Sequence, residues 1–234
     1  MKANSKQECY LCGKKASQTA EGTLTREHLP PKNLFSSPRP RLFTVPCCLA
    51  CNNQAHNDDE YFRVAVSAGY NANETGKEIW KEKVKGRTLK EGRISESVNK
   101  IRSSLKKIAL ITPEGVKDAV EATIEHEPID RVLTRITKGF LSRLYPEVNR
   151  SDLTFEITKL DQFKLNDPAF EIRKALNYFQ IGNGVYRCWH VVEDYTDRGA
   201  WVHMFFDSAA FFVQQTSDRQ IVLPWVIRRT PHHL

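Results

Sequence analysis

Apolar residues follow a strand, strand, helix order in the first third of the chain. Residues 23–28 and 42–45 are short β-prone stretches separated by a loop that contains four prolines. From Asn52 onward, Tyr61, Phe62 and the residues after them supply an apolar side at helical spacing. The pattern predicts a β-hairpin covered by the apolar side of a helix.

The middle and last thirds of the chain have other periods. Residues 98–108 and 129–144 place apolar residues at helical spacing, and each stretch predicts an amphipathic helix. A strand is expected at 120–124. After residue 150, aromatic and β-branched stretches separated by glycine-containing turns predict an antiparallel sheet, with a helix over 168–179. The strands of this sheet are expected at 153–157, 184–193, 200–206 and 211–215.

The segment GYNANETGK, residues 69–77, contains two glycines and two asparagines and marks a domain boundary. We therefore expect an α+β chain in three parts. These are a ββα unit in residues 1–70, a basic helical linker in 71–112 and an α+β C-terminal domain in 113–234.

The net charge is positive and concentrated in one segment. The chain of 234 residues carries +7 with a pI near 9.1, which favours a polyanionic partner, for which DNA is our expectation. Residues 74–107 hold eleven Lys or Arg against five Glu, a net charge of +6. For each cation the alternative to phosphate contact is a solvated surface position. The expected nucleic-acid-binding residues are Arg39, Arg41, Lys100, Lys106 and Lys107.

Several classes of protein are excluded by what the sequence lacks. No stretch approaches the roughly 20 apolar residues that cross a bilayer, and the N-terminus lacks the apolar core of a signal peptide. We therefore expect a cytoplasmic protein with no membrane partner. There is no phosphate-cradling glycine loop and no serine or cysteine nucleophile motif, which argues against ATP-driven and acyl-transfer chemistry.

Two Cys-x2-Cys pairs, Cys9/Cys12 and Cys48/Cys51, flank the predicted hairpin. Four thiolates paired in this way suit a tetrahedral zinc ion, and a closed four-cysteine shell predicts a structural role. Cys47 offers an alternative Cys-x3-Cys spacing; we favour Cys48 because two intervening residues are the usual arrangement. Six cysteines, four of them in zinc-like spacing, fit a reducing compartment better than a disulfide framework.

Between the cysteine pairs lies Glu27-His28, followed by Pro30 and Pro31. On a strand, neighbouring side chains face opposite ways, so one could ligate a cation while the other takes a proton from water. Oxygen ligands from Glu27 and Asn52 suit Mg²⁺ or Mn²⁺. His56, four residues after Asn52 on the same helix face, is a further possible ligand or a surface residue.

Together these residues resemble the HNH, or ββα-metal, endonuclease family, in particular a poorly characterised bacterial branch. The likeness covers residues 9–63: a Cys-x2-Cys pair, Glu27-His28 before prolines, and a second Cys-x2-Cys pair followed by Asn52. The resemblance implies a zinc-stabilised ββα unit in which His28 is the general base. It also implies that Glu27 and Asn52 hold the catalytic cation.

Our leading hypothesis is a metal-dependent endonuclease that hydrolyses DNA phosphodiester bonds. A zinc-supported nucleic-acid-binding module that does not cleave is the second hypothesis, because Arg41-Leu42-Phe43 stands where the family has its middle asparagine. A nuclease subunit that depends on a protein partner, or a homo-oligomer, is the third.

The expected C-terminal sheet holds residues that could have a function of their own. Trp189, Trp201 and Phe205 could stack on bases, and His190 and His203 could meet across paired strands. In both cases we favour a core or surface role.

Overall fold

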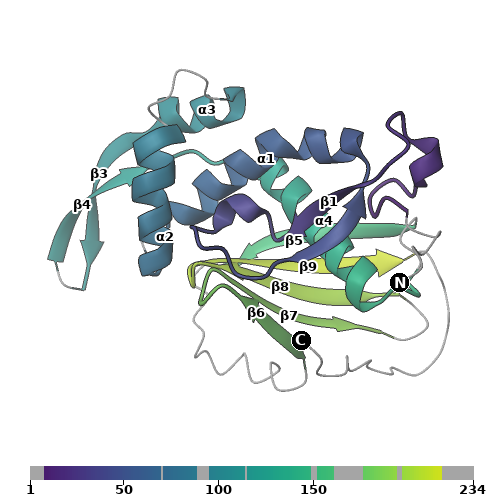
Figure 1. The fold of residues 1–234 in the computed structure, drawn as a ribbon. Coiled ribbons are helices and arrows are strands. Elements are labelled where there is room, and N and C mark those ends of the chain that lie inside the picture. The colour runs from purple at the N-terminus through teal and green to yellow at the C-terminus, as the bar shows by residue number, and fades with distance from the viewer. Residues whose placement is uncertain are drawn as a thin grey trace.

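The computed structural model describes residues 8–69, 71–88, 95–113, 115–148, 152–160, 176–193 and 197–217. In this part of the chain every strand pairs antiparallel, in two two-stranded sheets and one five-stranded sheet. Helices accompany the sheets, so the predicted α+β class is confirmed (Figure 1).

The N-terminal part is a hairpin followed by a helix, as the apolar pattern predicted. Strand β1 (Thr25–Leu29) pairs with β2 (Phe43–Cys47), and short 3-10 turns occupy Ala16–Gln18 and Lys32–Leu34. Helix α1 (Leu49–Ser67) begins directly after the hairpin, three residues before the predicted start.

The middle part is less helical than predicted. It contains α2 (Glu74–Ile79), a π-helix η3 (Trp80–Thr88), α3 (Glu96–Ser104) and a second hairpin of β3 (Lys106–Thr112) and β4 (Gly115–Glu121). The helix predicted over 98–108 is therefore wrong after Ser104, and the strand predicted at 120–124 lies earlier. In Figure 1 this hairpin projects away from the rest of the protein.

Helix α4 (His126–Leu144) links the two halves of the molecule and confirms the amphipathic pattern of 129–144. It contacts α1, both strands of the first hairpin, and strands β5 and β9. A Cβ atom at Gly139 would lie 2.4 Å from Cδ1 of Leu29, so β1 approaches the helix closely at this point.

The five-stranded sheet has the order β5-β9-β8-β7-β6, with α4 on one face (Figure 1). The helix predicted over 168–179 is wrong at Asn177–Phe179, which begin β6; residues 168–175 lie outside the described chain. The strands are β5 (Leu153–Leu160), β6 (Asn177–Ile181), β7 (Tyr186–Val192), β8 (Gly199–Phe205) and β9 (Ala209–Ser217).

One apolar core joins the parts that the sequence suggested as separate units. Its buried residues run from Cys9 to Val213, and β3 pairs with β4 across the expected boundary at 112/113. None of the described helices is both long enough and apolar enough to cross a membrane.

Candidate functional site

The four predicted cysteine ligands come together at one end of the hairpin. All four Sγ atoms of Cys9, Cys12, Cys48 and Cys51 lie within 4.8 Å of one another, and those of Cys12 and Cys48 are 3.8 Å apart. A tetrahedral zinc ion with Zn–S bonds of about 2.3 Å separates its sulfur ligands by roughly 3.8 Å. The cluster therefore could hold a structural metal such as zinc, whereas Cys47 is buried outside it.

Backbone hydrogen bonds shape this cluster. The Gly13 amide donates to the Cys9 carbonyl at 2.8 Å, with Gly13 at φ 71°, and this closes the first turn. The Tyr10 amide donates to the Pro46 carbonyl at 3.0 Å and ties the turn to β2. Burial raises the pKa of Cys9, but amide donors led by that of Cys48 outweigh it and bring the pKa to about 7. Burial raises the pKa of Cys12 and that of Cys51, so the lowered pKa is confined to Cys9 among these three thiols.

The first hairpin has an inner and an outer face because its side chains alternate. Glu27 lies opposite Val45, and this pair faces the protein interior. His28 lies opposite Thr44, and this pair faces outward, with Thr44 exposed and His28 half-buried. The side chains of Glu27 and His28 therefore point to opposite faces of the hairpin.

The Glu27 carboxylate is held by an arginine from α4. Arg135 Nη1 donates to Glu27 Oε1 at 2.8 Å, and Arg135 Nη2 donates to Asp59 Oδ1 on α1. Glu27 and Arg135 are 7% and 9% exposed, so the pair is buried. Burial raises the pKa of Asp59 to about 6 despite the opposing effect of the guanidinium. Glu27 Oε2 and the Tyr10 hydroxyl are both buried, and after burial itself the interaction with Glu27 is the main cause that raises the pKa of Tyr10.

The other two predicted cation ligands make different contacts. The Asn52 amide donates to Thr25 Oγ1 at 3.1 Å, and that hydroxyl donates to the Cys47 carbonyl at 2.7 Å. His56 is exposed. Within the described residues, the only cluster of three or more His, Cys, Asp or Glu side chains spaced to hold a metal is the four-cysteine group. The contacts of Glu27, Asn52 and His56 therefore lend no support to a catalytic Mg²⁺ or Mn²⁺ held among them.

Sequence reasoning did not find Arg135. The available signal was an arginine placed among the apolar positions Val132, Leu133 and Ile136 of an amphipathic helix. A cation on the buried side of a helix indicates a buried anion. The identity of that anion depends on contacts 108 and 76 residues away in the chain.

His28 has the surroundings of a proton acceptor. Burial lowers its pKa, the charges of Lys32 and Arg39 lower it further, and Glu27 opposes them. With a pKa below its usual value of about 6.5, the ring is mostly neutral at pH 7. The charges of Lys32 and Arg39 thus favour the neutral form of the imidazole.

The predicted nucleic-acid-binding residues fall into two groups. The charge of Arg39 lowers the pKa of His28. Arg41 is exposed and lies just before β2. Lys100 lies on α3 and pairs with Glu125 at 3.1 Å, while Lys106 and Lys107 are exposed on β3. The expectation that both lysines continue the helix is wrong, because the helix ends at Ser104.

The sheet histidines and aromatic residues belong to the core, which agrees with the interpretation favoured from sequence. Trp201 and Phe205 are fully buried, and Trp189 is 5% exposed. His203 is hydrogen-bonded to Thr137 at 2.9 Å and Tyr186 at 2.7 Å, and His190 to Tyr145 at 3.0 Å. Burial lowers the pKa of His190 to about 4 and that of His203 to about 3.

No protein-family model, curated protein or solved structure matches this chain. The argument for function therefore depends on residue chemistry and geometry. In these terms the first hairpin combines a four-cysteine cluster, a neutral histidine and nearby cations.

Proposed function

We propose that the protein is an endonuclease that hydrolyses DNA phosphodiester bonds with His28 as general base. The observation that carries this proposal is the setting of the His28 ring, half-buried on the outer face of β1 with its pKa lowered by burial, Lys32 and Arg39. A neutral imidazole accepts a proton, and the adjacent cations suit a phosphate group.

In the proposed reaction, His28 takes a proton from water as the water oxygen attacks phosphorus. The bond from phosphorus to the leaving oxygen breaks, and that oxygen gains a proton from solvent. Lys32 and Arg39 stabilise the negative charge that grows on the phosphate oxygens. The four cysteines would hold a structural metal that keeps the hairpin in place. Because Arg135 holds the Glu27 carboxylate, the proposal assigns no step to a divalent cation.

The test is nicking of supercoiled plasmid DNA by the parent protein and by His28→Ala. A general base contributes about 10²–10⁴-fold, so the variant should lose at least a hundredfold in rate. His56→Ala is the matched control, since His56 is an exposed histidine on the adjacent helix, and it should nick at the parent rate. Equal rates for parent and His28→Ala would remove His28 from the mechanism. Parallel reactions with Mg²⁺, Mn²⁺ and EDTA determine whether cleavage needs a divalent cation.

The pH dependence provides a second test. Only the neutral ring accepts a proton, and the pKa of His28 is lowered. The rate should therefore be level above about pH 6.5, the usual histidine pKa, and should fall only at lower pH. A rate that keeps rising between pH 7 and 9 would assign the proton transfer to another group.

A second candidate function is nucleic-acid binding without cleavage. The observation in its favour is the buried Glu27–Arg135 pair, in which a guanidinium already neutralises the carboxylate that was expected to hold the catalytic cation. Binding to DNA that weakens with salt, together with no nicking under any divalent cation, would select this function.

A further inference from the structure

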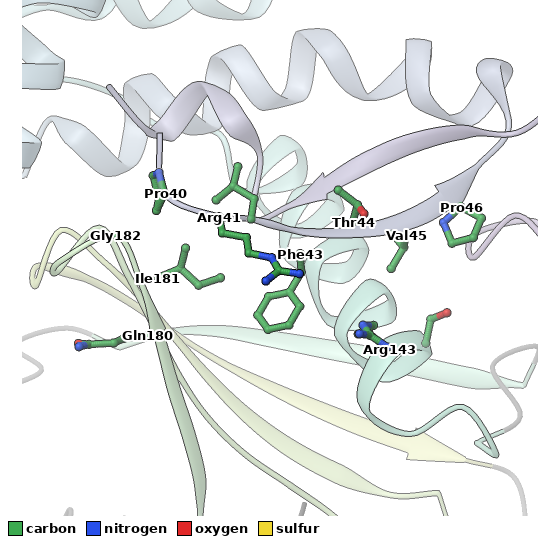
Figure 2. Close-up of a pocket in the computed structure, with 12 residues that line it drawn as sticks. Pro40, Arg41, Phe43, Thr44, Val45, Pro46, Arg143, Gln180, Ile181 and Gly182 are labelled. Atoms are coloured by element: carbon green, nitrogen blue, oxygen red, sulfur yellow. The ribbon is translucent and has the colours of Figure 1, made fainter. Parts of the chain in front are cut away.

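A cavity of about 800 Å³ lies between the first hairpin and the five-stranded sheet. It is lined by residues 40–46 of the hairpin, by Ser142 and Arg143 at the end of α4, and by residues 180–182 at the end of β6. Figure 2 shows the Arg41 side chain extending into this space from the hairpin side, with Arg143 on the neighbouring helix. Two arginines from distant parts of the chain therefore share one cavity.

The charge in this cavity is not balanced by the protein. None of its lining residues is an Asp or Glu. Neither Arg41 nor Arg143 forms an ion pair with another described residue, and both are exposed. Placing two like charges in one concave site raises the local potential and favours an anion from solution.

The rest of the lining adds neutral hydrogen-bond donors. Ser142 contributes a hydroxyl, whereas the Gln180 side chain points away from the cavity and accepts a hydrogen bond from the Tyr178 hydroxyl at 3.1 Å (Figure 2). The backbone of Thr44 adds a further donor, as the register of the hairpin implies. In an antiparallel ladder, the two residues of a hydrogen-bonded pair each donate an N–H to the other. Pro46 has no N–H, so Arg26 and Pro46 form a non-hydrogen-bonded pair.

Hydrogen-bonded pairs alternate along an antiparallel ladder. The amide of Thr44, two residues before Pro46, must therefore face away from β1 and toward the open edge of β2. In agreement, the Pro46 carbonyl leaves the ladder to accept the Tyr10 amide at 3.0 Å. The cavity thus presents two guanidinium groups, a hydroxyl and a backbone N–H.

We propose that this cavity binds phosphate groups, with Arg41 and Arg143 as the principal contacts, and that their source is the backbone of a nucleic-acid strand. Guanidinium groups match phosphate oxygens with two parallel hydrogen bonds. The identification of the source rests on the proposed nuclease function. Thr44 lines the cavity and is also the cross-strand neighbour of His28, so a strand held here passes one β-strand away from the proposed base.

The experiment measures binding in the His28→Ala background, so that cleavage does not interfere. A fluorescein-labelled single-stranded oligonucleotide is titrated with this protein and with Arg41→Gln, Arg143→Gln and the double variant, by fluorescence anisotropy. A hydrogen bond to a charged group corresponds to roughly 1.5–3 kcal/mol, so each substitution should raise the Kd at least about tenfold. Each should also reduce the slope of log K against log salt by about 1.

Arg131→Gln is the matched control, because Arg131 is an arginine of the same helix that pairs with Asp58 outside this cavity. It should leave the Kd unchanged. Arg143→Lys, which keeps the charge but loses the planar fork, should fall between the parent and Arg143→Gln. Thermal unfolding of each variant checks that it folds. An unchanged Kd for both Arg41→Gln and Arg143→Gln overturns the proposal.

Two further results separate the alternatives. If inorganic phosphate or a mononucleotide binds with the same arginine dependence and the oligonucleotide does not, the cavity is a small-phosphate site and the nucleic-acid source is wrong. If arginine-dependent oligonucleotide binding persists in a protein that never nicks DNA, the cavity proposal holds and the nuclease proposal fails. If His28 governs nicking but the arginine variants bind normally, the cavity proposal alone fails.

Discussion

The protein contains two β-hairpins that are stabilised in different ways. The first, β1–β2, has five residue pairs and buries Leu29 and Val45 to 1% and 3% exposure. The second, β3–β4, has seven pairs, yet Ile111 and Val116 at its tip are 84% and 71% exposed. The longer hairpin is thus the one with less tertiary support.

This difference shows that packing partners, rather than strand length or apolar content, determine which hairpin belongs to the core. Helix α4 contacts both strands of β1–β2, and the cysteine cluster fixes one end of it. A hairpin of two strands is only marginally stable by itself in water. The proposed site lies on the supported hairpin, where packing can hold side chains in fixed positions.

Removing a cysteine of the four-cysteine cluster should lower the stability of the first hairpin more than any other change. Structural zinc binding contributes about 10–16 kcal/mol in zinc-finger peptides, so Cys48→Ala should detach the Cys9–Cys12 turn from the start of α1 and lower the melting temperature strongly. The measurements are metal content per chain and thermal unfolding with and without a chelator.

The matched control for that experiment is Cys47→Ala. Cys47 adjoins Cys48 in the chain and is fully buried, but its sulfur lies outside the cluster. This variant should keep its metal and lose only the packing of one thiol. Equal metal content in Cys48→Ala and the parent would show that the cluster does not hold a metal through Cys48.

The buried ion pair behind the first hairpin should give the next largest effect. Arg135→Met leaves the buried Glu27 and the half-buried Asp59 without their cation, and breaking a buried pair in this way costs about 3–5 kcal/mol. Arg131→Met is the control, because Arg131 pairs with Asp58 at the surface and is 47% exposed. An exposed pair contributes at most about 1 kcal/mol. Urea unfolding measures both, and similar losses would show that Arg135 is not a buried structural cation.

The contact between β1 and α4 should give a smaller effect. A methyl group added by Gly139→Ala would collide with Leu29, which is buried and cannot move aside freely. Overpacking typically costs about 1–3 kcal/mol, partly offset by about 1 kcal/mol of improved helix propensity. Leu29→Val shortens the opposing side chain, so Gly139→Ala should destabilise that background less. Urea unfolding of the double-mutant cycle measures this coupling, and strictly additive effects would place the two residues out of contact.

The sequence predicted the supported hairpin better than the exposed one. Cysteine spacing and the apolar pattern located β1–β2, α1 and the four-cysteine cluster, because these depend on local order. The prediction of one helix over 98–108 is wrong after Ser104. The apolar residues of this segment keep helical spacing as far as Ile108, but the backbone becomes extended at Leu105. The ion pair of Glu27 could not be foreseen from sequence, since its partner Arg135 lies 108 residues away. Nothing local to Arg143 indicated that it shares a cavity with Arg41.

The smallest expected loss of stability is that of Val116→Thr in the second hairpin, and Val45→Thr in the first hairpin is its comparison. Val116→Thr on β4 keeps a β-branched side chain at a position that is 71% exposed, so the free energy of unfolding should change by no more than about 0.5 kcal/mol. Val45→Thr on β2 makes the same chemical change at a position that is 3% exposed. There the added hydroxyl loses its contact with water, which costs about 1–3 kcal/mol without a new hydrogen bond.

Urea unfolding at two protein concentrations measures both variants. If Val116→Thr destabilises as much as Val45→Thr and the loss grows with concentration, then β3–β4 is covered by a second copy in solution. In that case its exposed apolar residues form an interface, and the contrast between the two hairpins holds only for the single chain. If the effect of Val116→Thr stays small at both concentrations, β3–β4 depends on its own ladder while β1–β2 depends on the core.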